Sequence, residues 1–328
     1  MMLGAKSAPA SATVSVPLES AAHITVLLNE AVDALNIRAD GTYIDCTFGR
    51  GGHSKKILER LGAKGHLYAI DRDLAALAVG KSITDARFHI EHLHFSEVNQ
   101  LATKYKLTSV DGILLDLGIS SPQIDEAERG FSFRFDAPLD MRMNQSRGKT
   151  AAELLATISE QKLGEVIKDY GEERFAKQVA RAIIKERDDG RAVTTTGQLA
   201  KVVADAIPKV EPGQNPATRT FQALRIFVNQ ELEELSLVLP KCLQLLSEGG
   251  YLVVISFHSL EDRIVKRFIK SEENRDDLPA NFPVKAKDLP QPRLVTVGKA
   301  TKPSAGEIKL NQRCRSAVMR VAIRTATA

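Results

Sequence analysis

Short apolar runs alternate with stretches of helical periodicity in the first part of the chain. Each run is brief and bounded by turn residues, which is typical of strands buried on both faces of a parallel sheet. Helical periodicity lies between the runs, at residues 54–61 and 74–81. Because strand and helix alternate, the pattern predicts right-handed crossovers and a doubly wound α/β sheet. The predicted strands are residues 43–45, 66–71, 87–90 and 110–116.

This alternation stops after Pro122. Residues 125–215 are charged and mostly helical in periodicity, with one clear amphipathic segment at residues 171–181. The stretch 208–215 contains two prolines and a glycine, which indicates a boundary loop. We therefore expect a helical insertion of about 90 residues, which is longer than an ordinary loop and so favours a functional role.

The α/β pattern resumes in the last third of the chain. A long helix is predicted over residues 221–246, ended by Gly249 and Gly250, and a strand over residues 251–257. Two further runs, 293–297 and 317–324, have the pattern of an antiparallel edge pair.

The expected domain organisation follows from these patterns. One discontinuous α/β domain comprises residues 23–124 and 216–328, and the helical insertion comprises residues 125–215. Residues 1–22 lack a basic region followed by an apolar core, so we expect a flexible tail and not an export signal.

Composition excludes several classes of protein. Of the 328 residues, 43% are hydrophobic and 26% charged, and no apolar run approaches the roughly 20 residues that span a bilayer. The three cysteines lie far apart, which predicts no disulfide framework and favours a reducing cytoplasm. The net charge of +4 permits a polyanionic partner without requiring one.

Glycines cluster at the turn after the first predicted strand. Gly49, Gly51 and Gly52 leave no Cβ in the way of a ligand that approaches the backbone. Asp71 ends the second predicted strand 22 positions after Gly49, near the spacing of about 20 at which a carboxylate reaches a ribose. An adenosyl cofactor needs both features and a pocket at the carboxyl ends of the strands. Phe95, which we expect to end the third strand, would flank adenine there, and Asp116 ends the fourth strand.

The same turn favours S-adenosylmethionine over NAD. It lacks the third glycine of G-x-G-x-x-G, and Asp45 directly before it would repel a pyrophosphate. An acid there would suit the ammonium or sulfonium of a methionine moiety. A structural turn in some other α/β enzyme is the alternative that spacing alone leaves open.

Several longer motifs resemble those of one family, the bacterial ribosomal RNA small subunit methyltransferase H. The resemblance extends from about residue 23 to residue 324, with two small departures: Thr25 stands where proline is common, and residues 310–316 vary the usual segment. The motifs are HITVLLNE at 23–30, DCTFGRGGHS at 45–54, LDLGISSPQ at 115–123, RGFSF at 129–133, PLDMRM at 138–143, GEERFA at 171–176 and SFHSLEDR at 256–263.

This resemblance implies a fold and an activity. The fold is the Rossmann-like class I methyltransferase sheet, and the activity is methylation by S-adenosyl-L-methionine of N4 of a cytidine, position 1402, in the decoding region of 16S rRNA. The partner implied is 16S rRNA within the 30S subunit, and monomer and homodimer both stay open. The cofactor contacts implied are Gly51, Gly52, His53, Asp71, Phe95, Asp116 and Gln123, of which His53 and Gln123 come from the resemblance alone.

The N4 amine of cytosine is a poor nucleophile, so methyl transfer by direct in-line displacement needs positioning and hydrogen-bond acceptors. No cysteine nucleophile is required. We expect Ser121, aided by Asp116, to accept hydrogen bonds from the amine. A purely structural turn at residues 120–123 is the alternative.

Arginines alternate with aromatic residues at the start of the predicted insertion. Guanidinium and aromatic groups beside a cofactor site are suited to holding an unstacked base and its phosphates, although charge runs also mark ordinary solvated faces. His258, at the end of a predicted strand, is a further candidate for substrate contact. The histidine run 89–94 lacks a third ligand nearby, so no metal site is predicted. The candidate RNA contacts are Arg129, Arg134, Arg142, Arg219 and His258, with Arg147 and Arg225 beside them.

Three other functions stay open. The chain could methylate another nucleic-acid amino group, or it could be a non-enzymatic RNA-binding assembly factor that keeps only the fold. An NAD-dependent dehydrogenase is disfavoured by the missing glycine.

Overall fold

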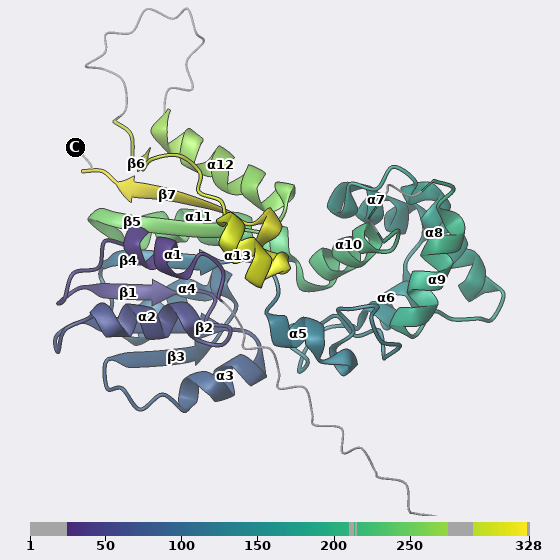
Figure 1. Ribbon diagram of the computed structural model, residues 1–328, viewed down its shortest axis with the longest axis horizontal. Helices are drawn as coiled ribbons and strands as arrows, with labels where there is room; N and C mark the ends of the chain where they lie inside the picture. The colour runs from purple at the N-terminus through teal and green to yellow at the C-terminus, as the bar shows by residue number, and fades with distance from the viewer. Residues whose placement is uncertain (1–24, 210–212, 214, 275–290, 327–328) are drawn as a thin grey trace, which may run out of the picture.

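A computed structural model describes residues 25–209, 213, 215–274 and 291–326. Its centre is one seven-stranded sheet in the order β3-β2-β1-β4-β5-β7-β6 (Figure 1). The first five strands of that order run parallel, and β7 is antiparallel to both β5 and β6. The predicted Rossmann-like sheet with an antiparallel edge pair is therefore confirmed. The strands are β1 (Thr42–Asp45), β2 (His66–Asp71), β3 (Phe88–His92), β4 (Val110–Asp116), β5 (Leu246–Ser256), β6 (Leu294–Thr296) and β7 (Val318–Arg324).

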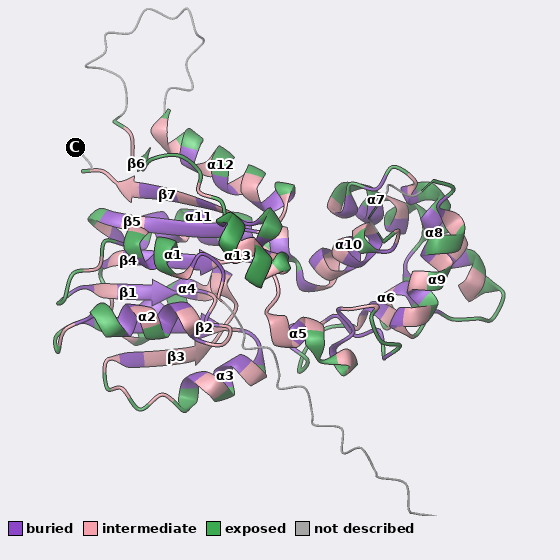
Figure 2. Cartoon of the chain, viewed as in Figure 1, coloured by how far each residue is buried: buried purple, intermediate pink, exposed green. Residues whose placement is uncertain are grey.

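Helices cover both faces of the sheet, so its central strands are largely buried (Figure 2). Strands buried on both faces are apolar on both sides. Tyr43 and Leu114 face the layer that contains α1, α2 and α3, whereas Ile44 and Leu115 face the opposite layer. Adjacent residues of one strand thus belong to two separate cores. The first layer consists of α1 (Leu28–Ala34), α2 (Gly52–Arg60) and α3 (Leu74–Lys81), and the second of α4 (Val98–Lys104), α11 (Glu231–Leu245) and α12 (Ser259–Glu273).

A helical part lies beside the carboxyl ends of the parallel strands (Figure 1). It has a hydrophobic core of its own, in which Leu163, Val179 and Leu199 are fully buried. The chain reaches it through the short helix α5 (Ser121–Asp125). Its helices are α6 (Ala151–Thr157), α7 (Glu160–Gly171), α8 (Ala176–Asp188), α9 (Thr196–Ala206) and α10 (Thr218–Asn229).

The far boundary of this part differs from the expectation of residue 215. Phe221 and Leu224 of α10 are buried in the core of the helical part, and α10 packs against α7. The amphipathic periodicity of α10 is therefore satisfied by the other helices and not by the sheet.

The long helix predicted over residues 221–246 is two helices in the structure. The chain turns at Gln230, whose φ of 52° is left-handed and ends α10 before α11 begins. The predicted amphipathic segment 171–181 is interrupted in the same way at Glu172, where φ is 50°. Gly249 and Gly250 lie inside β5 and do not end a helix. No helix among the described residues is long and apolar enough to cross a membrane.

Candidate active site

The turn after β1 brings the backbone close to the ends of β1 and β2. Gly49 and Gly51 have φ values of 56° and 77°, a region that favours glycine. The Gly49 amide donates to Asp71 Oδ2 at 2.7 Å. At Gly52, the first residue of α2, a Cβ would lie 1.9 Å from Thr25 Oγ1, so this position tolerates no side chain without a shift of the neighbouring segment.

Asp71 at the end of β2 binds the turn and the next helix together. Besides Gly49, its carboxylate accepts the amide of Asp73 at 2.8 Å. Burial raises the pKa of Asp71, and the two amide hydrogen bonds oppose that shift. A carboxylate oxygen has two lone pairs, so each oxygen of Asp71 retains one acceptor position for a ligand.

Asp45 does not face the cavity as the sequence suggested. Its side chain is only 1% exposed, and it accepts the Ser54 hydroxyl at 2.6 Å and the Thr47 amide at 3.1 Å. Burial raises the pKa of Asp45 to about 6, against the effect of these hydrogen bonds. Among the described residues lining the cavity Asp45 is absent, so its role is to anchor the start of α2.

Asp116 at the end of β4 has an oxygen available for a ligand. Its Oδ1 is buried and has no hydrogen-bond partner among the described residues, while Oδ2 lies 3.6 Å from His53 Nδ1. Burial raises the pKa of Asp116 well above its usual range, and the charges of Asp45 and Glu261 raise it further. The arrangement combines a buried acceptor with a strong tendency to take up a proton.

The helix α5 explains where Gln123 lies. Its side-chain oxygen accepts the Ser120 amide at 3.0 Å, and its Nε2 donates to Asp73 Oδ2 at 2.6 Å. Gln123 lines the cavity, as does Ser121, but both polar ends of its side chain already hold the local fold. Asp73, which sequence reasoning missed, also accepts Arg129 Nη1 at 2.9 Å.

These elements surround one cavity of about 380 Å³ at the carboxyl ends of the parallel strands. That volume is within the range of small-molecule and cofactor sites. Residues of the helical part and of α11 complete its wall, among them Met143 and Gln222. Of the predicted cofactor residues, Gly52, His53, Asp71, Phe95, Asp116 and Gln123 line the cavity. Gly51 instead faces the Phe48 ring, where a Cβ would lie 2.7 Å from that ring.

Phe95 lies beyond the third strand and not at its end. β3 ends at His92, and Phe95 begins the short 3₁₀ helix Phe95–Glu97. The polar residues at 91 and 92 are only partly buried at the sheet edge, so the strand continues past the apolar run used to predict it. Within the same run, His92 Nε2 lies 3.0 Å from the Arg72 carbonyl oxygen and His94 Nδ1 lies 3.5 Å from Glu234.

The predicted RNA-contacting arginines differ in their surroundings. We expected Arg129 to present its charge to RNA at the surface. It is instead buried and pairs with Asp73. Arg142 is held by Asp140 through two hydrogen bonds of 2.7 and 2.9 Å. Arg219 donates to the Glu172 carbonyl at 3.3 Å, and Arg225 forms a two-bond ion pair with Glu231. The exposed members of the set are Arg134 and Arg147.

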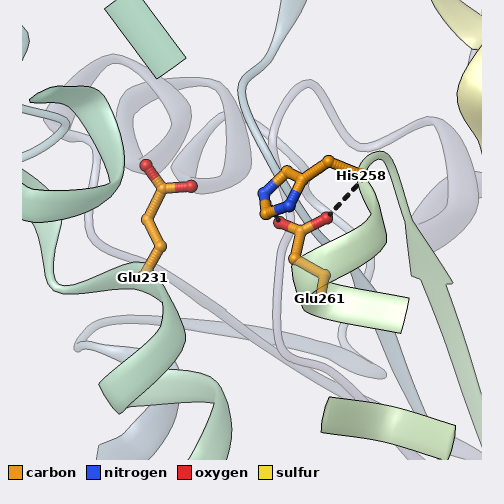
Figure 3. Close-up of side chains that lie close together, drawn as sticks. All are labelled: Glu231, His258 and Glu261. Atoms are coloured by element: carbon orange, nitrogen blue, oxygen red, sulfur yellow. Dashed lines mark hydrogen bonds and ion pairs between the residues drawn. The ribbon is translucent and has the colours of Figure 1, made fainter. Parts of the chain in front are cut away.

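His258 lies at the cavity wall, at the N-terminus of α12. Its Nε2 is 3.2 Å from Glu261 Oε1 (Figure 3). Glu261 Oε2 also accepts the Phe257 amide at 2.8 Å. Glu231 and Glu261 also line the cavity, and sequence reasoning missed both. Glu261 stands in the SFHSLEDR motif and could have been found there, whereas nothing near Glu231 in the sequence marks it.

Comparison with known proteins points to one family. Residues 20–325 match the model of the MraW methylase family. A protein of Methylobacillus flagellatus named ribosomal RNA small subunit methyltransferase H is 68% identical over 304 residues, covering 93% of this chain and 95% of that protein. A protein of the same name from Azoarcus sp. is 60% identical over 306 residues, covering 93% of this chain and 98% of its own length. The solved structure of an rRNA methylase from Streptococcus thermophilus aligns with a TM-score of 0.42 at 10% identity, covering 93% of this chain and all of that one.

Proposed function

The chain belongs to the MraW methylase family, and from that premise we propose that it methylates N4 of a cytidine, position 1402, in the decoding region of 16S rRNA. The observation that carries the proposal is the buried, unpartnered Oδ1 of Asp116 at the wall of the cofactor cavity. An amino group that must lose a proton during methylation needs such an acceptor close to the methyl donor.

The cofactor is S-adenosyl-L-methionine, which supplies a methyl group from its sulfonium when bound. The residues present fit it. A cavity of about 380 Å³ lies against the glycine turn, and a side chain at Gly52 would collide with Thr25. We expect Gly52, His53, Asp71 and Phe95 to hold the cofactor, with Gly51 shaping the turn; Gln123 would contribute through the position of α5.

The chain's own residues would act on the cytosine amine as follows. Asp116 Oδ1 accepts a hydrogen bond from the N4 amine, which holds the amine and localises its lone pair for in-line attack. On methylation, N4 would gain the methyl group that the bound cofactor supplies and would release one of its protons. The raised pKa of Asp116 suits this oxygen to take that proton. Ser121 lines the same cavity and offers a second acceptor, with a purely structural turn as the alternative.

The substrate is ribosomal RNA of the small subunit. This follows from the relatives above, each named a ribosomal RNA small subunit methyltransferase. We further propose that the assembled 30S subunit is the form recognised, and that the helical part beside the cavity contacts the RNA. The two exposed arginines, Arg134 and Arg147, lie in the segment that leads into that part.

Transfer of tritium from labelled S-adenosylmethionine tests the proposal. Unmodified 30S subunits and naked 16S rRNA from a strain that lacks the mark are the two substrates, and mass spectrometry of nuclease fragments maps the label. Label at N4 of one cytidine, higher in 30S subunits, is the expected result. Label at another amino group would refute the substrate site, and absence of cofactor binding in calorimetry would instead favour an assembly factor.

A further inference from the structure

Glu231, His258 and Glu261 come together from three separate places in the chain. Glu231 begins α11, His258 precedes α12, and Glu261 lies in its first turn. One possible ligand atom from each lies within 4.8 Å of the other two. Figure 3 shows the Glu231 carboxylate on one side of the His258 ring and the Glu261 carboxylate against that ring.

All three side chains are withdrawn from solvent. Glu231 is 6% exposed, Glu261 is 2% exposed, and the His258 side chain is 10% exposed. Neither ring nitrogen of His258 has a hydrogen-bond partner among the described residues, although Nε2 lies 3.2 Å from Glu261. A nine-tenths buried imidazole that has one carboxylate at ion-pair distance and a second nearby is suited to share a bound cation with them.

Glu261 is a buried carboxylate whose ion pair, among the described residues, is with His258. Its carboxylate accepts the amides of Phe257 and His258, but no lysine or arginine in the described part of the chain forms an ion pair with it. Buried carboxylates are ordinarily paired with a cation or bound to a metal. Asp116, which lines the same cavity, adds a further carboxylate to this wall.

We propose that Glu231, His258 and Glu261 bind one divalent transition-metal cation, Zn²⁺ or Mn²⁺, at the wall of the cofactor cavity. One imidazole nitrogen and two carboxylate oxygens suit these ions better than Mg²⁺, which favours oxygen ligands. Three ligands leave a coordination position for water or a substrate oxygen. Ligands of a tetrahedral ion at about 2.1 Å lie about 3.4 Å apart, so small side-chain rotations would close the site.

Arg225 is compatible with this site. It donates to both oxygens of Glu231 at 2.9 Å, and a carboxylate has about four acceptor positions. Glu231 can therefore bind Arg225 and a cation at the same time. Arg225 would then orient the ligand, as hydrogen-bonded neighbours of metal-bound carboxylates commonly do.

Metal content and calorimetry test the proposal on the full-length chain. Metal-free protein is titrated with Zn²⁺ and, separately, with Mn²⁺, then dialysed and assayed for bound ion. We expect one equivalent of one of these ions in the wild type and at least about ten-fold weaker binding in His258→Gln. That variant keeps Glu261, which accepts the amides at the start of α12, so the helix should still form.

Glu234→Gln is the matched control. It removes a partly buried carboxylate from the same helix, and that carboxylate contacts His94 and Ser96, not the cluster. It should bind the ion as the wild type does. Should His258→Gln fail to fold, Glu231→Gln replaces it, and the ion should raise the Tm of the wild type and of Glu234→Gln only. A wild type that retains neither ion, or a cluster variant that binds as tightly as the wild type, overturns the proposal.

Discussion

Asp116 differs in two ways from an ordinary solvent-exposed aspartate. Its Oδ1 lacks a hydrogen-bond partner among the described residues, and burial raises its pKa. Asp116→Asn keeps the shape of the side chain but cannot take up the amine proton. We therefore expect single-turnover methylation at saturating cofactor to fall about 100-fold.

Ser121→Ala is the comparison for that variant. Ser121 lines the same cavity, so a loss of rate comparable with that of Asp116→Asn would assign the hydroxyl to the amine. An unchanged rate would leave the residue as part of the turn. A wild-type rate in Asp116→Asn itself would remove Asp116 from the mechanism.

Asp45 makes the stability of the fold depend on pH. Its pKa rises from 3.8 to about 6 on folding because the carboxyl is buried. The folded state therefore binds the proton more tightly, and this stabilisation is present below pH 3.8 and lost as pH rises through about 6. Two pKa units correspond to about 3 kcal/mol. The free energy of unfolding of Asp45→Asn, minus that of the wild type, should therefore increase by about 3 kcal/mol between pH 4 and pH 7. Urea unfolding at each pH measures this difference.

Asp85 provides the opposite case. Its hydrogen bonds with Arg87 lower its pKa to about 2, so its contribution is lost only as pH falls below its ordinary range. The free energy of unfolding of Asp85→Asn, minus that of the wild type, should therefore not increase between pH 4 and pH 7. Parallel pH profiles for Asp45→Asn and the wild type would contradict the assignment to Asp45.

At single positions, the sequence was informative where the chemistry is local. The glycine turn follows β1 directly, and Asp71 and Asp116 are the last residues of β2 and β4, so their placement at the cavity was predictable. Arg129 was not, because its partner Asp73 lies 56 residues away and only the fold brings them together. Asp45 was also misjudged, since no pattern shows that a strand-end acid turns toward Ser54 in the following helix.

Among the elements, Gln230 accounts for the main error in the predicted helices. The periodicity of α10 and α11 is nearly continuous, but the exposed Gln230 adopts a φ of 52° and separates them. The left-handed region costs roughly 1 kcal/mol for a residue with a Cβ. Gln230→Gly should therefore raise the free energy of unfolding by up to about 1 kcal/mol, measured in urea.

Gln178 supplies the matched control for this substitution. It is exposed within α8, where glycine costs about 1 kcal/mol, so Gln178→Gly should lower the free energy of unfolding. The same substitution should thus raise the free energy of unfolding at position 230 and lower it at position 178. A loss of stability in Gln230→Gly as large as that in Gln178→Gly would show that the left-handed conformation of Gln230 does not destabilise the fold.

The strands were predicted more accurately than the helix ends. Buried parallel strands are continuous apolar runs, and all seven predicted runs overlap observed strands. Helix ends depend on a single backbone angle, as at Gln230 and Glu172, and glutamine and glutamate give no signal for a left-handed conformation. Such ends become fixed only when neighbouring helices pack.

At the scale of the whole molecule, side-chain hydrogen bonds hold the helical part against two of the helices that cover the sheet. Glu172, between α7 and α8, accepts the Ser259 hydroxyl at 2.7 Å and Arg263 at 3.1 Å at the start of α12. Tyr170 donates to Glu233 of α11 at 2.6 Å. These contacts place the helical part beside the cavity wall, which is compatible with our proposal that the helical part contacts the RNA.

The arginines of the insertion can be separated by the salt dependence of RNA binding. Each phosphate contact contributes a slope of roughly −0.7 to −0.9 in log K against log salt. Arg134→Ala and Arg147→Ala, which remove exposed charges, should each reduce the slope magnitude by up to about 1 with little change in Tm.

Arg129→Ala should behave in the opposite way. It leaves Asp73 buried without its cation, which costs about 3–5 kcal/mol and lowers the Tm, whereas its guanidinium is not presented to phosphates. Filter binding to 16S rRNA across a salt series, run beside thermal unfolding, distinguishes the two classes. Wild-type slopes in both exposed-arginine variants would place the RNA elsewhere on the molecule. Loss of a cation that contacts a phosphate reduces the number of counterions released on binding, so it must reduce the slope.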